Sequence, residues 1–138
     1  MDGFGEVGGE RWDEAPELVS PILRVVPVRT GEHAIVVLAG DVDTSTVELV
    51  RAVAEQCLQQ RPQRLSIDLS SVQFCDCSGV RALRGVRADA DAAGVEFRLI
   101  APSAWIRRVF VLAEAEELLD VAVEPALEPA FDGNDELT

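Results

Sequence analysis

Apolar positions along this chain follow two different spacings, and each spacing predicts one kind of element. Short, mostly apolar runs rich in Val, Ile and Leu occupy residues 22–28, 34–40, 64–70 and 95–101, and their length is typical of strands. Elsewhere the apolar residues recur every three or four positions, as they do on the buried face of an amphipathic helix. Such helices are expected within residues 44–61, 76–93 and 103–115.

The order of these elements predicts an α/β domain with a mixed sheet. A short glycine-containing connection joins residues 22–28 to 34–40, which favours an antiparallel hairpin. The later strands are separated by helices, and such crossovers produce parallel neighbours. Pro27 cannot donate a ladder hydrogen bond, so its strand is expected at an edge or a bulge. A last short strand within 118–123 and a short helix within 124–131 complete the expected order.

Polar residues before the helices support these boundaries. Thr44 or Ser45 is the expected N-cap of the first helix, with Glu48 placed for a capping box. Asp76 and Ser103 take the same position before the second and third helices. We therefore expect three defined helix starts, and the second follows closely on an apolar strand.

The net charge of −13 is concentrated at the two ends of the chain. Residues 1–19 carry six acidic side chains and one Arg, whereas residues 124–138 carry five acidic side chains and no basic one. We expect a flexible acidic N-terminal tail at 1–19, a folded domain at 20–130 and a disordered C-terminal end at 131–138. Nucleic acid and anionic lipid both need clustered positive charge, so this balance argues against either partner.

The sequence contains no segment that predicts secretion or membrane insertion. No apolar window is long enough for a transmembrane helix, and the N-terminal residues lack the basic and apolar regions of a secretory signal. We therefore expect a cytoplasmic protein. Its cysteines, Cys57, Cys75 and Cys77, should remain thiols in that reducing compartment, and Cys57 lies on the apolar face of its helix.

Residues able to support catalysis or metal binding are few. His33, the single histidine, lies in the hairpin turn, and nothing in the sequence places it beside a nucleophile. The chain has no glycine-rich phosphate loop, and Cys75 and Cys77 lack the second ligand pair of a structural zinc site. Asp41 and Asp43 fit a solvated loop with a helix cap better than a metal site. We expect no enzyme activity, no cofactor and no metal.

The stretch Asp76-Cys77-Ser78-Gly79 is the leading candidate site. It opens a helix, and a helix N-terminus presents unpaired N–H groups and a partial positive charge. A phosphate added to a hydroxyl in this first turn would be stabilised there and would change the surface that a partner meets. An aspartate at this position is also explained as a simple N-cap, so the residues alone leave both interpretations open.

Three segments resemble the STAS domains of the anti-sigma factor antagonist family. They are AIVVLAGDVDTSTVELVRAVAEQ, LSIDLSSVQFCDCSGVRALRGV and PSAWIRRVFVLAEAEELLDV, in consistent order and spacing from about Leu23 to Leu127. The resemblance implies a mixed sheet with amphipathic helices packed mainly on one face. It also implies a binding module that captures an anti-sigma factor, commonly a serine protein kinase, and so releases a sigma factor for transcription.

The resemblance also implies regulation by phosphorylation, from which this sequence departs. In the family the kinase phosphorylates the serine directly after the motif aspartate, and a phosphatase restores the active form. Here Asp76 and Gly79 match the motif, but Cys77 takes the phosphoserine position and Ser78 follows it. Three interpretations remain: a constitutive antagonist, phosphorylation of Ser78, or oxidation of Cys77.

The partner surface implied by the resemblance surrounds this turn. It comprises Asp41, Asp43, Asp76, Cys77, Ser78, Gly79, Arg81 and Arg84. Two other functions remain open within the same fold: a STAS subunit of a lipid or anion transport assembly, and a nucleotide-binding STAS sensor. A thiol-based redox enzyme is a weaker alternative, because the Cys-x-x-Cys spacing is missing.

Overall fold

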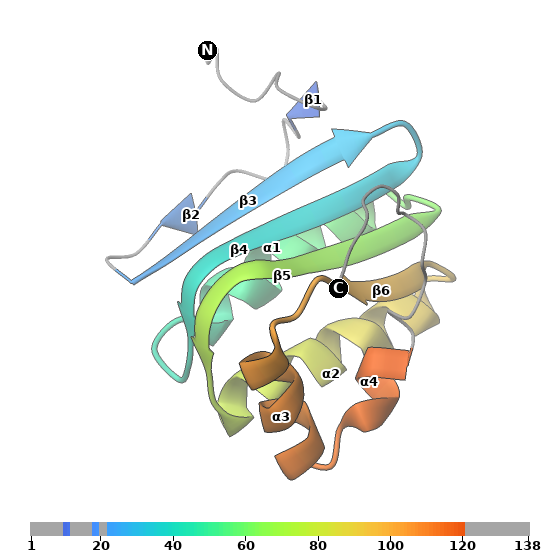
Figure 1. Cartoon of the computed structure of the whole chain (residues 1–138). Coiled ribbons are helices and arrows are strands. Elements are labelled where there is room, and N and C mark those ends of the chain that lie inside the picture. Colours follow the sequence, from blue (N-terminus) through green and yellow to red (C-terminus); the bar gives the residue numbers. More distant parts are fainter. Residues whose placement is uncertain (1–9, 12–17, 20–21, 121–138) are drawn as a thin grey trace, which may run out of the picture.

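The computed structural model describes residues 10–11, 18–19 and 22–120 (Figure 1). Its strands are β1 (Glu10–Arg11), β2 (Leu18–Val19), β3 (Leu23–Thr30), β4 (His33–Val42), β5 (Arg64–Cys75) and β6 (Glu96–Ile100). Its helices are α1 (Val47–Gln59), α2 (Cys77–Ala92), α3 (Ala104–Leu112) and α4 (Glu116–Asp120). From β4 to α3, strands and helices alternate as the apolar spacings predict.

The strands form a mixed sheet in which β3, β4, β5 and β6 are neighbours in that order (Figure 1). β3 and β4 form an antiparallel hairpin, whereas β4 with β5 and β5 with β6 are parallel pairs. The crossovers run through α1 and α2, which pack against each other and against the sheet. The α/β class, the mixed sheet and the leading hairpin predicted from the sequence are therefore confirmed.

The centre of the core is formed by residues at matching register in three adjacent strands. Val36 of β4 lies beside Ile67 of β5, which lies beside Leu99 of β6, and all three are fully buried. Burying each such side chain stabilises the fold by about 1.5–3 kcal/mol. Cys57 of α1 is buried in the same core, as its place on an apolar helix face predicts.

β5 is longer than the sequence predicts: the expected strand ends at residue 70, whereas β5 continues through residues 71–74 to Cys75. Its pairing with β4 contains two irregularities, one between Val37 and Ala39 and one between Gly40 and Asp41. Bulges of this kind interrupt the two-residue period of buried side chains, so the polar residues of this stretch resemble a loop. The extension carries the strand directly to the start of α2.

Of the residues 118–123, within which we expected a short strand, 118–120 belong to helix α4, and 121–123 lie outside the described residues. Leu118 and Leu119 are both buried, and a short apolar run by itself does not distinguish a strand from a buried helix. The short helix and the disordered end that we expected beyond residue 120 lie outside the described residues.

β1 and β2 lie within residues 1–19, where we expected a flexible tail. Both pair antiparallel with β3, β1 at Arg29 and β2 at Val25. The residues of these two strands therefore belong to the sheet, and the remainder of the segment lies outside the described residues. Pro27 lies between the part of β3 that pairs with β1 and the part that pairs with β2. Its missing N–H therefore removes no hydrogen bond to either strand.

Candidate functional site

Two loops meet at the carboxyl ends of the parallel strands β4 and β5. Val42 ends β4 opposite Cys75, the last residue of β5. The backbone N–H of Asp76 donates to the carbonyl of Val42 at 3.3 Å and joins the two strand ends. The loop 43–46 and the start of α2 therefore lie side by side.

Asp76 is the N-cap of α2, as predicted. Its Oδ1 accepts the backbone N–H of Gly79 at 3.1 Å and the hydroxyl of Ser78 at 2.6 Å. Partial burial raises the pKa of Asp76, but these hydrogen bonds outweigh it and hold the pKa below the usual value for aspartate. The ionised carboxylate is thus engaged in holding the turn together.

Replacing Asp76 with alanine should lower the free energy of unfolding by about 1 kcal/mol near neutral pH, because the substitution removes the cap. Since the folded-state pKa is depressed, the ionic part of this contribution is present above the unfolded-state pKa and is lost as pH falls through the folded-state pKa. In denaturant titrations, the difference between the two proteins should therefore shrink below about pH 4.

Ser103→Ala is the matched control for this prediction. Ser103 caps α3 by accepting the backbone N–H of Ile106 at 3.1 Å, and its hydroxyl does not titrate in this range. Its loss should lower the free energy of unfolding by a similar amount at every pH tested. The same pH dependence in both variants would contradict the role assigned to the Asp76 carboxylate.

Asp43 and Thr46 organise the neighbouring loop. The Asp43 carboxylate accepts the backbone N–H of Ser45 at 2.9 Å and the Ser45 hydroxyl at 2.7 Å. The Thr46 hydroxyl donates to the carbonyl of Asp41 at 2.9 Å and accepts the N–H of Asp43 at 2.9 Å. The predicted capping box is therefore wrong: Thr46 is the N-cap of α1 in place of Thr44 or Ser45, and its side chain holds the loop instead of capping the helix.

A hydrogen bond between side chains connects the two loops. Thr44 Oγ1 donates to Ser78 Oγ at 3.3 Å, and Ser78 in turn donates to Asp76. The half-buried Ser78 hydroxyl thus has a partner on each side. No local pattern in the sequence indicates this role of Thr44, because the contact joins residues that are far apart in the chain.

Cys77 is exposed at the first position of α2, whereas Cys57 and Cys75 are buried. Burial raises the pKa of both buried thiols to about 12, and charge on the adjacent Asp76 and Cys77 adds to this effect for Cys75. Cys77 is therefore the cysteine that solvent reaches. It borders a hollow of about 190 Å³ together with Val80, Arg81, Arg84 and Ala113.

The two arginines predicted at the partner surface have different environments. Arg81 is exposed and forms no ion pair with the described acidic residues. Arg84 donates to the carbonyl of Glu114 at 3.0 Å and to the carboxylate of Glu117 at 2.8 Å. Arg84 thus connects α2 to α4 and the turn before it, whereas the charge of Arg81 faces solvent.

Phe74 is a candidate interface residue that the sequence reasoning missed. Its side chain is 44% exposed at the end of β5, opposite Asp41. An exposed aromatic residue beside a polar turn is typical of a protein interface. Sequence alone did not indicate this exposure, because the strand expected from the sequence ends at residue 70, before Phe74.

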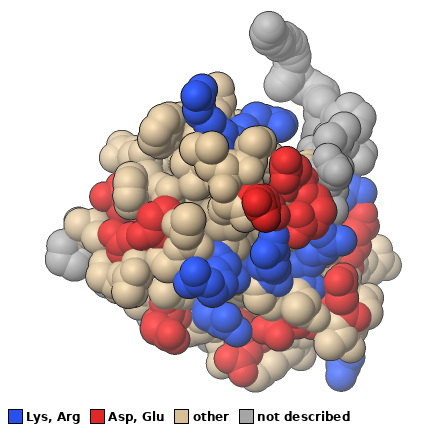
Figure 2. All heavy atoms as spheres, turned by 90° about the horizontal axis from the view of Figure 1, so that it is seen from below, with Lys and Arg blue, Asp and Glu red and all other residues tan. Residues whose placement is uncertain are grey.

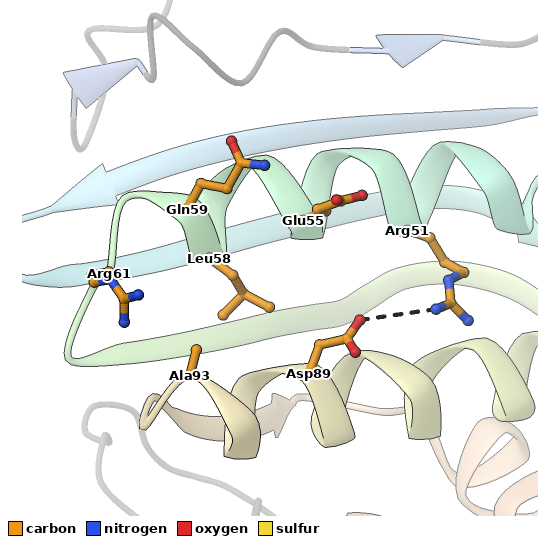
Figure 3. Close-up of a pocket in the computed structure, with 7 residues that line it drawn as sticks. All are labelled: Arg51, Glu55, Leu58, Gln59, Arg61, Asp89 and Ala93. Atoms are coloured by element: carbon orange, nitrogen blue, oxygen red, sulfur yellow. Dashed lines mark ion pairs between the residues drawn. The ribbon is translucent and has the colours of Figure 1, made fainter.

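A second hollow lies between α1 and α2, outside the turn (Figure 3). Its volume is about 540 Å³, and the side chains of Arg51 and Asp89 approach within 3.9 Å of each other there. This hollow, the groove between α1 and α2, is bordered by charged groups of both signs. Its lining residues include no glycine-rich phosphate loop. The lining residues are Arg51, Glu55, Leu58, Gln59, Arg61, Asp89 and Ala93.

His33 does not approach the turn. It begins β4 opposite Arg64, the first residue of β5, whereas Asp76 and Cys77 follow the other ends of these strands. Among the described residues, no three His, Cys, Asp or Glu side chains are grouped to hold a metal ion. Within residues 22–120, no helix has the length and apolar character needed to cross a membrane.

The chain belongs to the STAS domain family. The model of that family matches residues 24–130, which include both loops of the site. A search of curated proteins finds no match to the chain. The family predicted from the three sequence segments is therefore confirmed.

Solved structures with this fold include antagonists and a transporter domain. An anti-sigma factor antagonist from Mycobacterium paratuberculosis is 20% identical, with 74% of this chain and 87% of that chain covered and a TM-score of 0.65. The unphosphorylated form of SpoIIAA, an anti-sigma factor antagonist from Bacillus, is 23% identical, with 70% and 84% covered and a TM-score of 0.59. The murine anion transporter solute carrier 26 family member A9 is 19% identical, with 64% and 15% covered and a TM-score of 0.55. At these identities the likeness shows the fold.

Proposed function

We propose that this protein is a cytoplasmic anti-sigma factor antagonist that acts by binding and not as an enzyme. Its partner is an anti-sigma factor of the serine-kinase type, and capture of that partner releases a sigma factor. The observation that carries this proposal is the exposed Cys77 on the first turn of α2, joined through Ser78 and Thr44 to the adjacent loop. The fold shared with known antagonists supports the proposal.

The thiol at position 77 favours an antagonist that is always able to bind. A serine kinase cannot form phosphoserine at Cys77, and the hydroxyl of Ser78 is held between Asp76 at 2.6 Å and Thr44 at 3.3 Å. An acceptor hydroxyl must turn toward the donor phosphate, so these bonds support the constitutive interpretation over phosphorylation of Ser78. Oxidation of the exposed Cys77 thiol is the third interpretation.

Capture of an anti-sigma factor is tested with the full chain. The tagged protein should retain from its own cells a protein that mass spectrometry identifies as an anti-sigma factor, and the purified pair should bind directly. Cys77→Glu places a negative charge in the proposed surface and should raise the Kd at least about tenfold, which corresponds to about 1.4 kcal/mol.

Gln59→Glu is the matched control, because it adds the same charge at an exposed position of the groove between α1 and α2. Its Kd should equal that of the unaltered protein. Equal losses in both variants would show that the partner does not recognise the turn. Capture of an anion-transport protein would support the transport alternative, and direct binding of a nucleotide would support the sensor alternative.

A further inference from the structure

α3 presents a stripe of large side chains to solvent. Trp105 and Leu112 are 58% and 75% exposed, whereas Ile106 and Phe110 on the opposite side of the helix are buried. Trp105, Arg108 and Leu112 are three and four residues apart, so they follow one another along one side of α3. Tryptophan and arginine are enriched where proteins meet. The stripe therefore has the composition of an interaction surface.

Positive charge surrounds this stripe. Arg107 and Arg108 are exposed on α3, and Arg81 is exposed on α2. None of these three arginines forms an ion pair with an acidic residue in the part of the chain that the structure describes, and α3 itself contains no acidic residue. Figure 2 shows the end of the molecule that lies lowest in Figure 1, where basic side chains gather near the middle and acidic ones surround them.

A hollow connects α3 to the turn that opens α2. Its volume is about 190 Å³, and it is bordered by Cys77 and Arg81 of α2 and by Ala113, which directly follows Leu112 at the end of α3. α3 also contacts β5, the strand that leads into the turn. In Figure 1 the start of α2 and α3 both lie at the lower end of the molecule. We call this region the turn–α3 surface, and it comprises Cys77, Arg81, Trp105, Arg107, Arg108 and Leu112.

We infer that the partner covers the turn–α3 surface with an acidic segment that carries an apolar side chain, an inference that rests on the function proposed above. Carboxylates of this segment pair with Arg107 and Arg108, and its apolar side chain packs against Trp105 and Leu112. Charge complementarity favours this occupant, because exposed arginines without an acidic partner nearby attract an anionic group.

Two other occupants fit the surface less well. In a symmetric pair of chains, the same arginines of both copies would face each other and repel. A flat anionic membrane would meet not only the arginines but also the acidic side chains that surround them in Figure 2. A compact acidic segment of a protein avoids both repulsions, because it covers the basic part of the surface alone.

Charge reversal on α3 tests the inference with the purified anti-sigma factor. Arg107→Glu with Arg108→Glu should raise the Kd at least about tenfold, because repulsion replaces attraction. The control is Arg51→Glu with Arg61→Glu, an exposed pair in the groove between α1 and α2. It makes the same change in charge away from the turn–α3 surface and should leave the Kd unchanged. Equal Kd values for the two double variants would overturn the inference.

Fluorine NMR of the full chain labelled with 5-fluorotryptophan tests the apolar contact. The chain has two tryptophans, so Trp12→Phe assigns the remaining signal to Trp105. Unlabelled anti-sigma factor should shift or broaden this signal, and Trp105→Ala should raise the Kd at least about tenfold. The same spectral change in the concentrated chain alone, or with phosphatidylglycerol vesicles, would assign the surface to a second copy or to a membrane and would overturn the inference.

Cys77→Glu separates this inference from the proposed function. If Cys77→Glu raises the Kd and the α3 variants bind as the unaltered chain does, the antagonist function stands and the contact with α3 is overturned. If the α3 variants alone bind weakly, the contact with α3 stands and recognition of the turn is overturned. An anti-sigma factor that does not bind the full chain would overturn both.

Discussion

Replacing Gly79 with alanine should lower the free energy of unfolding by about 1–3 kcal/mol. A Cβ atom at this position would lie 2.7 Å from Sγ of Cys75, 2.9 Å from Cγ1 of Val42 and 3.0 Å from the carbonyl oxygen of Val42. The sulfur and the methyl group belong to short, buried side chains and the oxygen to the backbone, so these atoms give way only by a rotamer change in the packed core or by a shift of the strand ends or α2. Thermal and denaturant unfolding of the purified variant measure the loss.

Gly85→Ala is the control, because it makes the same substitution in the same helix. There the nearest atom to a new Cβ is Nη1 of Arg51, at 2.8 Å. This is the end of a flexible, exposed side chain whose ion pair with Asp89 spans 3.9 Å and contributes little. Alanine should therefore raise the stability by about 0.5–1 kcal/mol through its better helix propensity.

If Gly79→Ala lowers the free energy of unfolding and Gly85→Ala raises it, helix propensity does not explain the glycine at position 79. The close approach of α2 to the strand ends then requires it. A Gly79→Ala protein as stable as the unaltered chain would contradict that conclusion. The result concerns function as well as stability, because the same approach positions Asp76, Cys77 and Ser78 on the surface.

Replacing Cys77 with serine should convert a protein that is not phosphorylated at this position into one that is. Incubation with ATP and the kinase partner should leave residue 77 of the unaltered chain without phosphate, whereas Cys77→Ser should take up about one phosphate per chain. The exposed first turn of α2 tolerates the added charge, because its backbone N–H groups stabilise an anion. Mass spectrometry of the intact protein and of its peptides measures the change.

Ser78→Ala separates this prediction from the alternative acceptor. In the Cys77→Ser background it should leave the phosphate uptake intact, and in the unaltered background it should change nothing. Rapid and stoichiometric phosphate on Ser78 of the unaltered chain would contradict a constitutive antagonist. A Cys77→Ser protein that binds the kinase but takes up no phosphate would contradict the assignment of residue 77 to the phosphoserine position.

The sequence predicted most of the fold because its elements carry strong, local signals. The apolar periods and the caps at Asp76 and Ser103 gave the order from the hairpin to α3. The errors occur where local signals are weak. Bulges in the pairing of β4 with β5 made residues 70–74 resemble a loop, and the adjacent Leu118 and Leu119 suit a strand or a helix equally.

The candidate site was predicted only in part, because its central residues are consecutive whereas its contacts are not. The capping role of Asp76 follows from sequence, and the structure adds that Cys77 is exposed and that Ser78 is held by Thr44. The exposure of Phe74 depends on how far β5 extends. Such properties arise from strand register and packing, which a single sequence does not encode in a readable local pattern.

The contrast among the three cysteines makes this domain convenient for spectroscopy. A maleimide dye should attach to Cys77 alone under native conditions, since Cys57 and Cys75 are buried and have pKa values of about 12. The natural chain therefore carries one cysteine that a dye can label, Cys77, within the proposed partner surface. Its emission would report directly on the arrival and departure of any binding partner.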